Sequence, residues 1–312
     1  MRLLMLGTGP FAVPTLQALA SSNHDLVQVV TRPPRGRAKK SANPMRQAAH
    51  DLQLETWDPE TVNAVGAQEQ LRQLAADLLV VCDYGEILRP ATLDTACFGG
   101  INLHGSLLPK YRGAAPVQWA ILNGEQETGN SVIQMTPGLD TGPCLAQEAT
   151  PIDPEETAAE LESRLAILGA ALVCRVVDGI AAGRTASVKQ DPARTTKAPR
   201  LQKADGALDW SQPSTRVKNQ IRAMIPWPRA FTFWHRPQGE PLRLNIDKVS
   251  CVAGEPAAVP GTVLVADKQL VVQAGDGGVE ICRLQAAGRR PMPAAEFLRG
   301  NRVLAGDRLG PV

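Results

Sequence analysis

A strand, a glycine turn, a helix and a second strand follow one another within the first thirty residues. Residues 3–6 form a short apolar run, and Gly7 and Gly9 punctuate the turn after it. Residues 13–21 then have a helical pattern, and residues 26–30 form a second apolar run. This order is typical of a βαβ unit with parallel strands.

The same alternation continues along the first half of the chain. Apolar runs at residues 78–81 and 101–103 alternate with helical segments around residues 68–76 and 115–123. Because parallel strands need long crossover connections, usually helices, this pattern predicts a Rossmann-like α/β domain with a mostly parallel sheet.

The rest of the chain has a different pattern. The pair Asp153-Pro154 predicts the start of a long helix that ends near Gly183. Beyond the polar, basic stretch 184–204, turns alternate with about five short strands, which suits a small OB-like β-barrel. The chain has 312 residues, and single cores stop growing at roughly 250–300. We therefore predict a catalytic domain over residues 1–183, a basic linker over 184–204 and a β domain over 205–312.

The net charge of +2 hides a strong asymmetry. Residues 1–183 carry 13 basic and 20 acidic residues, a balance of −7, whereas residues 184–312 carry 20 and 11, a balance of +9. A basic domain of this kind indicates a polyanionic partner, although two ordinary domains can also differ in this way.

The cysteines and the first residues of the chain indicate in which compartment the protein resides and whether it holds a metal. The six cysteines are widely scattered, and none forms a cluster with histidine, so we expect a reducing compartment and no metal site. The first apolar run is too short for a signal peptide, and no apolar stretch is long enough to span a membrane. We expect a cytoplasmic protein.

The glycine turn admits two interpretations. The spacing Gly7-x-Gly9-x-x-Ala12 between a strand and a helix resembles a dinucleotide-binding fingerprint. The second strand ends in Thr31-Arg32 instead of the acid that would hold a ribose. An NADP site that uses Arg32 therefore stays open beside a plain structural turn.

The densest group of chemically useful residues lies at residues 101–116. Asn102 and His104 are two residues apart at the end of a predicted strand, so their side chains share one face. Open α/β sheets bind ligands at the carboxyl ends of their strands. Either residue alone would more simply be a hydrogen-bonded core histidine or a turn asparagine.

A second loop, residues 135–142, presents one carboxylate between two glycines. Asp140 can orient His104 and stabilise its charge, as acids do for catalytic imidazoles. The alternative is an Asx-turn acid that stabilises only its own loop.

Together these motifs resemble the folate-dependent formyltransferases, and within them the enzymes that act on aminoacyl-tRNA. The resemblance rests on Asn102 to Pro116, on Glu127-Thr128-Gly129 and on Gly138 to Gly142, and it extends to Pro226-Trp227-Pro228 and the C-terminal end. It implies transfer of the formyl group of 10-formyltetrahydrofolate to the amino group of methionine on initiator tRNA. Asp83 departs from the family pattern, which has a small apolar residue before the tyrosine.

The resemblance also implies roles for individual residues. Asn102 would donate to the developing oxyanion, His104 would donate as well or pass on a proton, and Asp140 would hold the imidazole. The folate cosubstrate would be bound by Ser106, Leu107, Leu108 and Pro109, with Tyr84, Gly85, Ile87 and Leu88 framing the pterin.

The expected tRNA contacts are basic. They comprise Arg37, with Arg35, Lys39 and Lys40 beside it in an acid-free loop, and Lys203 near the second domain. A solvated, mobile loop is the simpler interpretation of such a charge run. We expect a monomer and no metal requirement. The aromatic cluster is expected to fill the core of the second domain, and it comprises Trp210, Trp227, Phe231, Phe233 and Trp234.

Other functions stay open at this point. One is a formyltransferase that uses the same cosubstrate on another amine, such as an amino-sugar nucleotide, and another is a hydrolase that releases formate. An NADP-dependent reductase and a tRNA-binding module without catalysis belong to other classes of protein.

Overall fold

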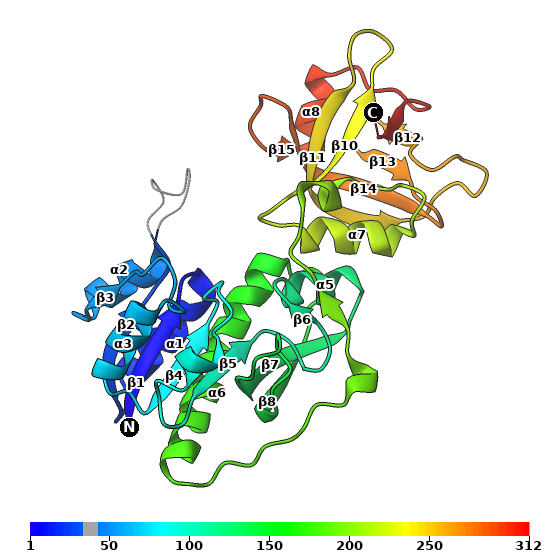
Figure 1. Ribbon diagram of the computed structural model, residues 1–312. Coiled ribbons are helices and arrows are strands. Elements are labelled where there is room, and N and C mark those ends of the chain that lie inside the picture. The colour runs from blue at the N-terminus through cyan, green and yellow to red at the C-terminus, as the bar shows by residue number, and fades with distance from the viewer. Residues whose placement is uncertain (34–42, 312) are drawn as a thin grey trace. The chain divides into compact units, whose positions relative to one another are not determined.

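The computed structural model describes residues 1–33 and 43–311 and contains two compact units (Figure 1). The first unit comprises Met1–Pro116, Glu127–Pro151 and Leu161–Pro199. The second comprises Val117–Gln126, Ile152–Glu160 and Arg200–Val312. The chain therefore contributes two short segments from its first 160 residues to the second unit.

A seven-stranded sheet forms the centre of the first unit, in the order β3-β2-β1-β4-β5-β7-β8. The first five strands of this order are parallel, and β7 and β8 add to the sheet in the antiparallel sense. The strands are β1 (Arg2–Gly7), β2 (Asp25–Val30), β3 (Thr56–Trp57), β4 (Leu78–Cys82), β5 (Gly100–His104), β7 (Glu127–Gln134) and β8 (Cys144–Pro151). This sheet confirms the predicted Rossmann-like, mostly parallel architecture.

Helices cover the sheet and connect its strands. They are η1 (Pro10–Ala12), α1 (Val13–Ala20), α2 (Pro44–Asp51), α3 (Val65–Gln73), α4 (Pro90–Leu93) and α6 (Ala158–Ala181), with α5 (Pro116–Leu122) largely in the second unit. Helix α6 packs closely on β5. Gly169 of this helix has no room for a side chain, since a Cβ there would lie 2.7 Å from Leu103 Cδ2. The opposite face of β1 and β4 carries Leu4, Leu6, Leu79 and Val81 in one buried cluster.

Helix α6 begins later than the sequence predicts. Asp153 accepts a hydrogen bond from the Glu155 amide at 2.8 Å, so it forms a local turn and caps no helix. Thr157 and Glu160 instead make a capping box, in which the Thr157 amide donates to Glu160 Oε2 at 2.8 Å. The predicted end is confirmed, since Gly183 has a φ of +66°, which favours glycine.

The stretch 184–204, predicted as a linker, contains η3 (Pro192–Arg194) and β9 (Lys197–Ala198), and η4 (Lys203–Gly206) begins at its end. Strand β9 pairs in parallel with β6 (Arg112–Gly113). The main chain of Val188 exchanges two hydrogen bonds of 2.8 Å with Cys144 on β8. Residues 184–199 are therefore built into the first unit, whereas residues 200–204 belong to the second.

An antiparallel sheet in the order β12-β13-β14-β11-β10-β16 forms the second unit, with β15 paired to β14. A bridge between Thr262 and Arg308 brings the two ends of that order together, so the sheet is a nearly closed barrel, as predicted. Its elements are α7 (Ser214–Ala223), β10 (Ala230–His235), β11 (Leu242–Val252), β12 (Val263–Ala266), β13 (Leu270–Gln273), β14 (Gly278–Ala286), β15 (Met292–Pro293), α8 (Ala294–Gly300) and β16 (Arg308–Gly310).

The expected aromatic core of this unit is only partly confirmed. Trp210 and Trp234 are buried, but Trp227 is 50% exposed. Phe231 and Phe233 are half-buried, because side chains alternate along β10 and these two lie on the face opposite Trp234. The Phe231 and Phe233 rings meet edge to face at 5.9 Å.

Three further features concern the described part of the chain. All six of its cysteines are free thiols. No described helix is long and apolar enough to cross a membrane. No group of three or more potential metal ligands gathers among the described residues.

Candidate active site

Asn102 and His104 lie at the carboxyl end of β5, on the same face of the sheet. The register pairs Asn102 with Val81 of β4, and Val81 with Leu6 of β1, so this face belongs to the buried cluster of Leu6 and Val81. His104 itself is paired with Ser131 of β7. The strand therefore delivers both polar side chains to the sheet edge that open α/β proteins use for ligands.

The His104 ring is buried and lies between the Tyr111 carbonyl and the Asp140 carboxylate. Its Nε2 lies 2.9 Å from the Tyr111 carbonyl oxygen, which can only accept, so Nε2 carries a proton and donates it there. Its Nδ1 lies 3.8 Å from Asp140 Oδ2. That distance is too long for a hydrogen bond, so Nδ1 faces a carboxylate without being bound by it and is left for a third group, to which it donates when the ring is an imidazolium.

Asp140 reaches this position from the loop between β7 and β8. Its Oδ2 accepts a hydrogen bond of 2.9 Å from the Gly113 amide, and its side chain is only 10% exposed. The structure thus brings together His104 and Asp140, as the sequence predicted, and adds Gly113 as the group that orients the carboxylate. Within the described part of the chain, the Asn102 amide has no hydrogen-bond partner and is available to a ligand.

Residues 106–109, expected to bind folate, form a tightly bonded loop beyond β5. Ser131 Oγ donates to the Ser106 carbonyl at 2.6 Å and accepts from the Leu108 amide at 3.0 Å. Gln147 donates to the Leu108 carbonyl at 2.8 Å. Leu107 is half-buried, and Leu108 and Pro109 are buried and joined by a cis peptide bond. The main chain of this loop is thereby fixed beside His104 and not left to solvent.

The second expected folate segment, residues 84–88, follows β4. Tyr84 and Leu88 are buried, whereas Gly85 and Ile87 are exposed. Thr8 Oγ1 of the glycine turn donates to the Tyr84 carbonyl at 3.1 Å. Burial raises the pKa of the Tyr84 hydroxyl above its usual range, chiefly through desolvation. A main-chain surface between β1 and β4 results, at the topological switch point of the sheet.

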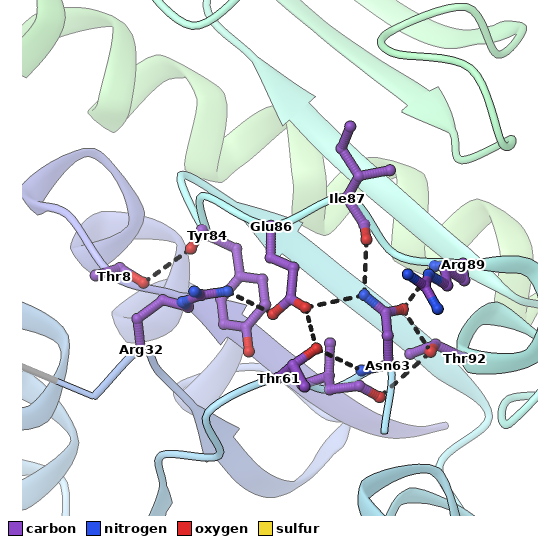
Figure 2. Close-up of polar contacts among 10 residues, drawn as sticks. Thr8, Arg32, Thr61, Asn63, Tyr84, Glu86, Ile87, Arg89 and Thr92 are labelled. Carbon is purple, nitrogen blue, oxygen red and sulfur yellow. Dashed lines mark hydrogen bonds and ion pairs between the residues drawn. The ribbon is translucent and has the colours of Figure 1, made fainter. Parts of the chain in front are cut away.

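Glu86 holds this segment in place, and sequence reasoning assigned it no role. Figure 2 shows its carboxylate between Arg32, at 2.5 Å, and the side chains of Thr61 and Asn63. Asn63 also donates to the Ile87 carbonyl at 2.9 Å and accepts from the Arg89 amide at 2.8 Å. The signal in the sequence was a lone acid inside an otherwise apolar loop.

The same contact decides the role of Arg32. The NADP alternative relied on this guanidinium as a partner for a phosphate. In the structure it is paired with Glu86, and both side chains are less than one-fifth exposed. Arg32 therefore serves to hold the 84–88 loop, and the glycine turn serves to receive it.

Asp83, the residue that departs from the family pattern, lies at the end of β4 with a φ of +47°. Although the residue as a whole is exposed, its carboxyl group points at the glycine turn, where a Cβ at Gly9 would lie 1.7 Å from Oδ2. Desolvation, and secondarily the charge of Glu162 on α6, raise the pKa of Asp83 to about 6.

We expect the Asp83→Asn variant to reveal this raised pKa as a pH-dependent stability. The folded chain holds the Asp83 proton more tightly than the unfolded chain, so the contribution of Asp83 to the stability of the wild type falls as pH rises from about 4 to 6. Because the residue keeps solvent exposure, we expect ~1 kcal/mol, or a Tm for Asp83→Asn about 3 °C above the wild type at pH 7. The two proteins should melt together at pH 4. An equal Tm difference at both pH values would contradict the raised pKa.

Most of the expected tRNA-binding residues fall outside the described structure. Arg35, Arg37, Lys39 and Lys40 lie between the described ranges, so their contacts stay predictions. Lys203, at the start of η4, is exposed. It belongs to the second unit.

A Rossmann-like sheet with an Asn–His–Asp site at its carboxyl edge, followed by a nearly closed barrel, is the architecture of a two-domain group-transfer enzyme. Residues 1–177 match the formyl transferase family, and residues 200–302 match the formyl transferase C-terminal domain. The chain belongs to the formyl transferase family. Its curated relatives include the methionyl-tRNA formyltransferase of Solibacter usitatus, 44% identical over 99% of both chains. That of Geobacter sulfurreducens is 40% identical over 99% of this chain and 97% of the relative.

Solved structures with the same fold include sugar formyltransferases. The sugar 3N-formyltransferase WlaRD, crystallised in the presence of dTDP and 5-N-formyl-THF, has a TM-score of 0.69 over 93% of this chain and 99% of its own. The N-formyltransferase of Helicobacter canadensis, in complex with folinic acid and dTDP-3-aminofucose, has a TM-score of 0.68 over 89% and 98%. Identities of 18% and 19% make these likenesses of fold alone.

Proposed function

We propose that this chain transfers the formyl group of 10-formyltetrahydrofolate to the amino group of methionine esterified to initiator tRNA. The observation that carries the proposal is the identity of 39–44% with methionyl-tRNA formyltransferases across 99% of the chain. The placement of His104 beside Asp140 supports the same chemistry. The relatives named above come from bacteria, in keeping with a bacterial type of enzyme.

The reaction places specific demands on the site. The neutral amine attacks the formyl carbon, and negative charge develops on the formyl oxygen. Asn102, whose amide is unengaged, and His104, through Nδ1–H, donate to that oxygen. Asp140 stabilises the positive imidazole and accepts the amine proton through water. As the N–C bond to folate breaks, the positive His104 gives its Nδ1 proton to the leaving nitrogen, and the proton that Asp140 accepted from the amine restores the imidazolium.

Folate recognition in this proposal depends on main-chain groups. The loops 84–88 and 106–109 lie at the ends of β4 and β5, which are neighbours in the sheet. Their main chains are fixed by Glu86, Asn63, Ser131 and Gln147. A preorganised main chain can bind the pterin edge without ordering cost at the moment of binding.

An acceptor other than aminoacyl-tRNA is the principal alternative, because the sugar formyltransferases share the fold. The charge of residues 184–312, a balance of +9, favours the polyanion. A decisive assay supplies 10-formyltetrahydrofolate with methionyl initiator tRNA, free methionine or an amino-sugar nucleotide and measures formylated product. Product from the tRNA alone is expected. Product from free methionine as well, or from the sugar alone, would overturn the proposal.

We expect Arg37→Ala to raise KM for methionyl-tRNA about tenfold and to leave KM for the folate cosubstrate within twofold. An arginine that contacts tRNA phosphates contributes affinity for that polyanion and none for a cosubstrate that it does not touch. Arg46→Ala is the matched control, because Arg46 is exposed and already paired with Asp58. This variant should leave both KM values unchanged. An equal rise of both KM values in Arg37→Ala would contradict a role of this loop in tRNA binding.

A further inference from the structure

Gln190 is a buried carboxamide beside the active site for which the proposed reaction has no use. It lies in the stretch between α6 and β9 and is 8% exposed. Its Nε2 donates to the carbonyl oxygens of Asp140, at 2.8 Å, and Gly142, at 2.7 Å. Its Oε1 accepts from Arg112 Nε at 3.1 Å and from a terminal Arg112 nitrogen at 2.7 Å.

All four hydrogen-bonding positions of this amide are therefore filled. The orientation is fixed as well, because turning the amide over would set its oxygen against two carbonyl oxygens and its nitrogen against a guanidinium. The two carbonyls and the guanidinium that Gln190 binds all belong to loops of the active site. Gln190 thus joins the Asp140 loop to the loop that contains Arg112.

The Asp140 loop needs such a connection. Asp140 has a φ of +52°, a conformation that side-chain-bearing residues rarely hold without outside support. Its side chain is held by the Gly113 amide, next to Arg112, and its main chain is held by Gln190. The two contacts fix the carboxylate from opposite ends of the residue.

The support for Gln190 is itself rigid. Two residues before it, Val188 exchanges two main-chain hydrogen bonds with Cys144. Seven residues after it, β9 pairs with β6, and Thr196 binds the Tyr111 amide at 2.8 Å. Tyr111 in turn accepts the Nε2 proton of His104. The segment 188–198 therefore contacts both halves of the His104–Asp140 pair.

We infer that Gln190 is a positioning residue that sets the distance and direction of Asp140 toward His104. The inference rests on the proposed formyl transfer for its kinetic consequence. Gln190 does not touch the reacting atoms, so its loss should lower kcat and spare substrate binding. A displacement of a reacting group by about 1 Å can cost on the order of 100-fold in rate.

The test compares Gln190→Leu with Gln273→Leu. Gln273 is a glutamine of similar burial in the barrel, where its amide also binds main-chain groups, at 2.8 Å each. We expect Gln190→Leu to lower kcat about 10- to 100-fold with both KM values within twofold, and Gln273→Leu to leave kcat unchanged. In the Asp140→Asn background, adding Gln190→Leu should change kcat by less than twofold, because the residue acts through Asp140. Gln190→Glu, which keeps the acceptor toward Arg112 but loses both donors, should repeat the pattern.

Amide hydrogen exchange gives a readout that needs no activity. The Gly113 amide, which donates to Asp140, should exchange at least tenfold faster in Gln190→Leu and at the wild-type rate in Gln273→Leu. Unchanged exchange and kcat in Gln190→Leu, or an equal further loss in the Asp140→Asn background, would overturn the inference. A wild type that fails to formylate methionyl-tRNA would instead overturn the proposed function, and the exchange result would still decide the role of Gln190.

Discussion

His104→Ala should lower kcat for formyl transfer by roughly a thousandfold or more, because the side chain supplies both an oxyanion donor and a proton. Removing one such donor typically costs about 10²–10³-fold, and general acid–base catalysis adds about 10²–10⁴-fold. KM for folate should change little, because the loops 84–88 and 106–109 are held by other residues. Quenched-flow measurement of formylated tRNA gives kcat over the required range.

A histidine elsewhere supplies the control. His50→Ala removes an exposed ring on α2 that contacts Asp51 at 3.4 Å, and it should retain wild-type kcat. Because His104 is buried, circular dichroism and Tm must show that His104→Ala is folded at the assay temperature. A folded His104→Ala variant within tenfold of wild-type kcat would remove His104 from the mechanism.

Gly142→Ala should disrupt the site from within its scaffold. A Cβ at this position would lie 1.7 Å from the Gln134 carbonyl oxygen, which belongs to the main chain of β7 and cannot turn aside. The hairpin between β7 and β8 must open, and Asp140, two residues away, must move with it. Overpacking of this kind costs about 1–3 kcal/mol, so we expect Tm to fall by about 3–10 °C and kcat by about 100-fold.

Gly66→Ala is the matched control for this change. Gly66 lies in α3, and nothing approaches within 4 Å of the position its Cβ would take. Gly66 lies in the first turn of α3, where alanine gains less than the roughly 0.5–1 kcal/mol that it gains over glycine in a helix interior, so this variant should melt at or slightly above the wild-type Tm with unchanged kcat. If Gly142→Ala retained the wild-type Tm and kcat, the hairpin would be far more compliant than its geometry indicates.

Local pattern was enough to predict the frame of the molecule. Strands β1, β2, β4 and β5 follow apolar runs whose burial on both faces requires covering helices, and these predictions are confirmed. The barrel was also predicted, because short alternating strands with frequent turns have few other ways to bury their apolar faces. The start of α6 was wrong, since two capping signals compete within five residues and only packing selects between them.

Within the site and the barrel, too, local pattern predicted some features, and the completed fold decided the others. Two residues of spacing on one strand placed Asn102 and His104 on a common face, since strand geometry fixes that relation without reference to the rest of the fold. Phe231 and Phe233 were misjudged as core, because which face of β10 points inward depends on how the barrel closes. A lone acid in an apolar loop was the only local sign of Glu86, and no local pattern marked Gln190. The partners of these two residues lie 23 to 78 residues away along the chain.

By itself, the sequence determined the two architectures, and it pointed to the carboxyl edge of β5 as the candidate site and to the residue types that the proposed chemistry needs. The tertiary structure decided which of those residues meet: Asp140 beside His104, Arg32 on Glu86 in place of a phosphate, and the predicted linker as a support of the Asp140 loop. The physical reason is range. Propensity and periodicity act over a few residues, whereas a buried carboxamide or carboxylate must satisfy its hydrogen bonds with whatever groups the completed fold brings within about 3 Å.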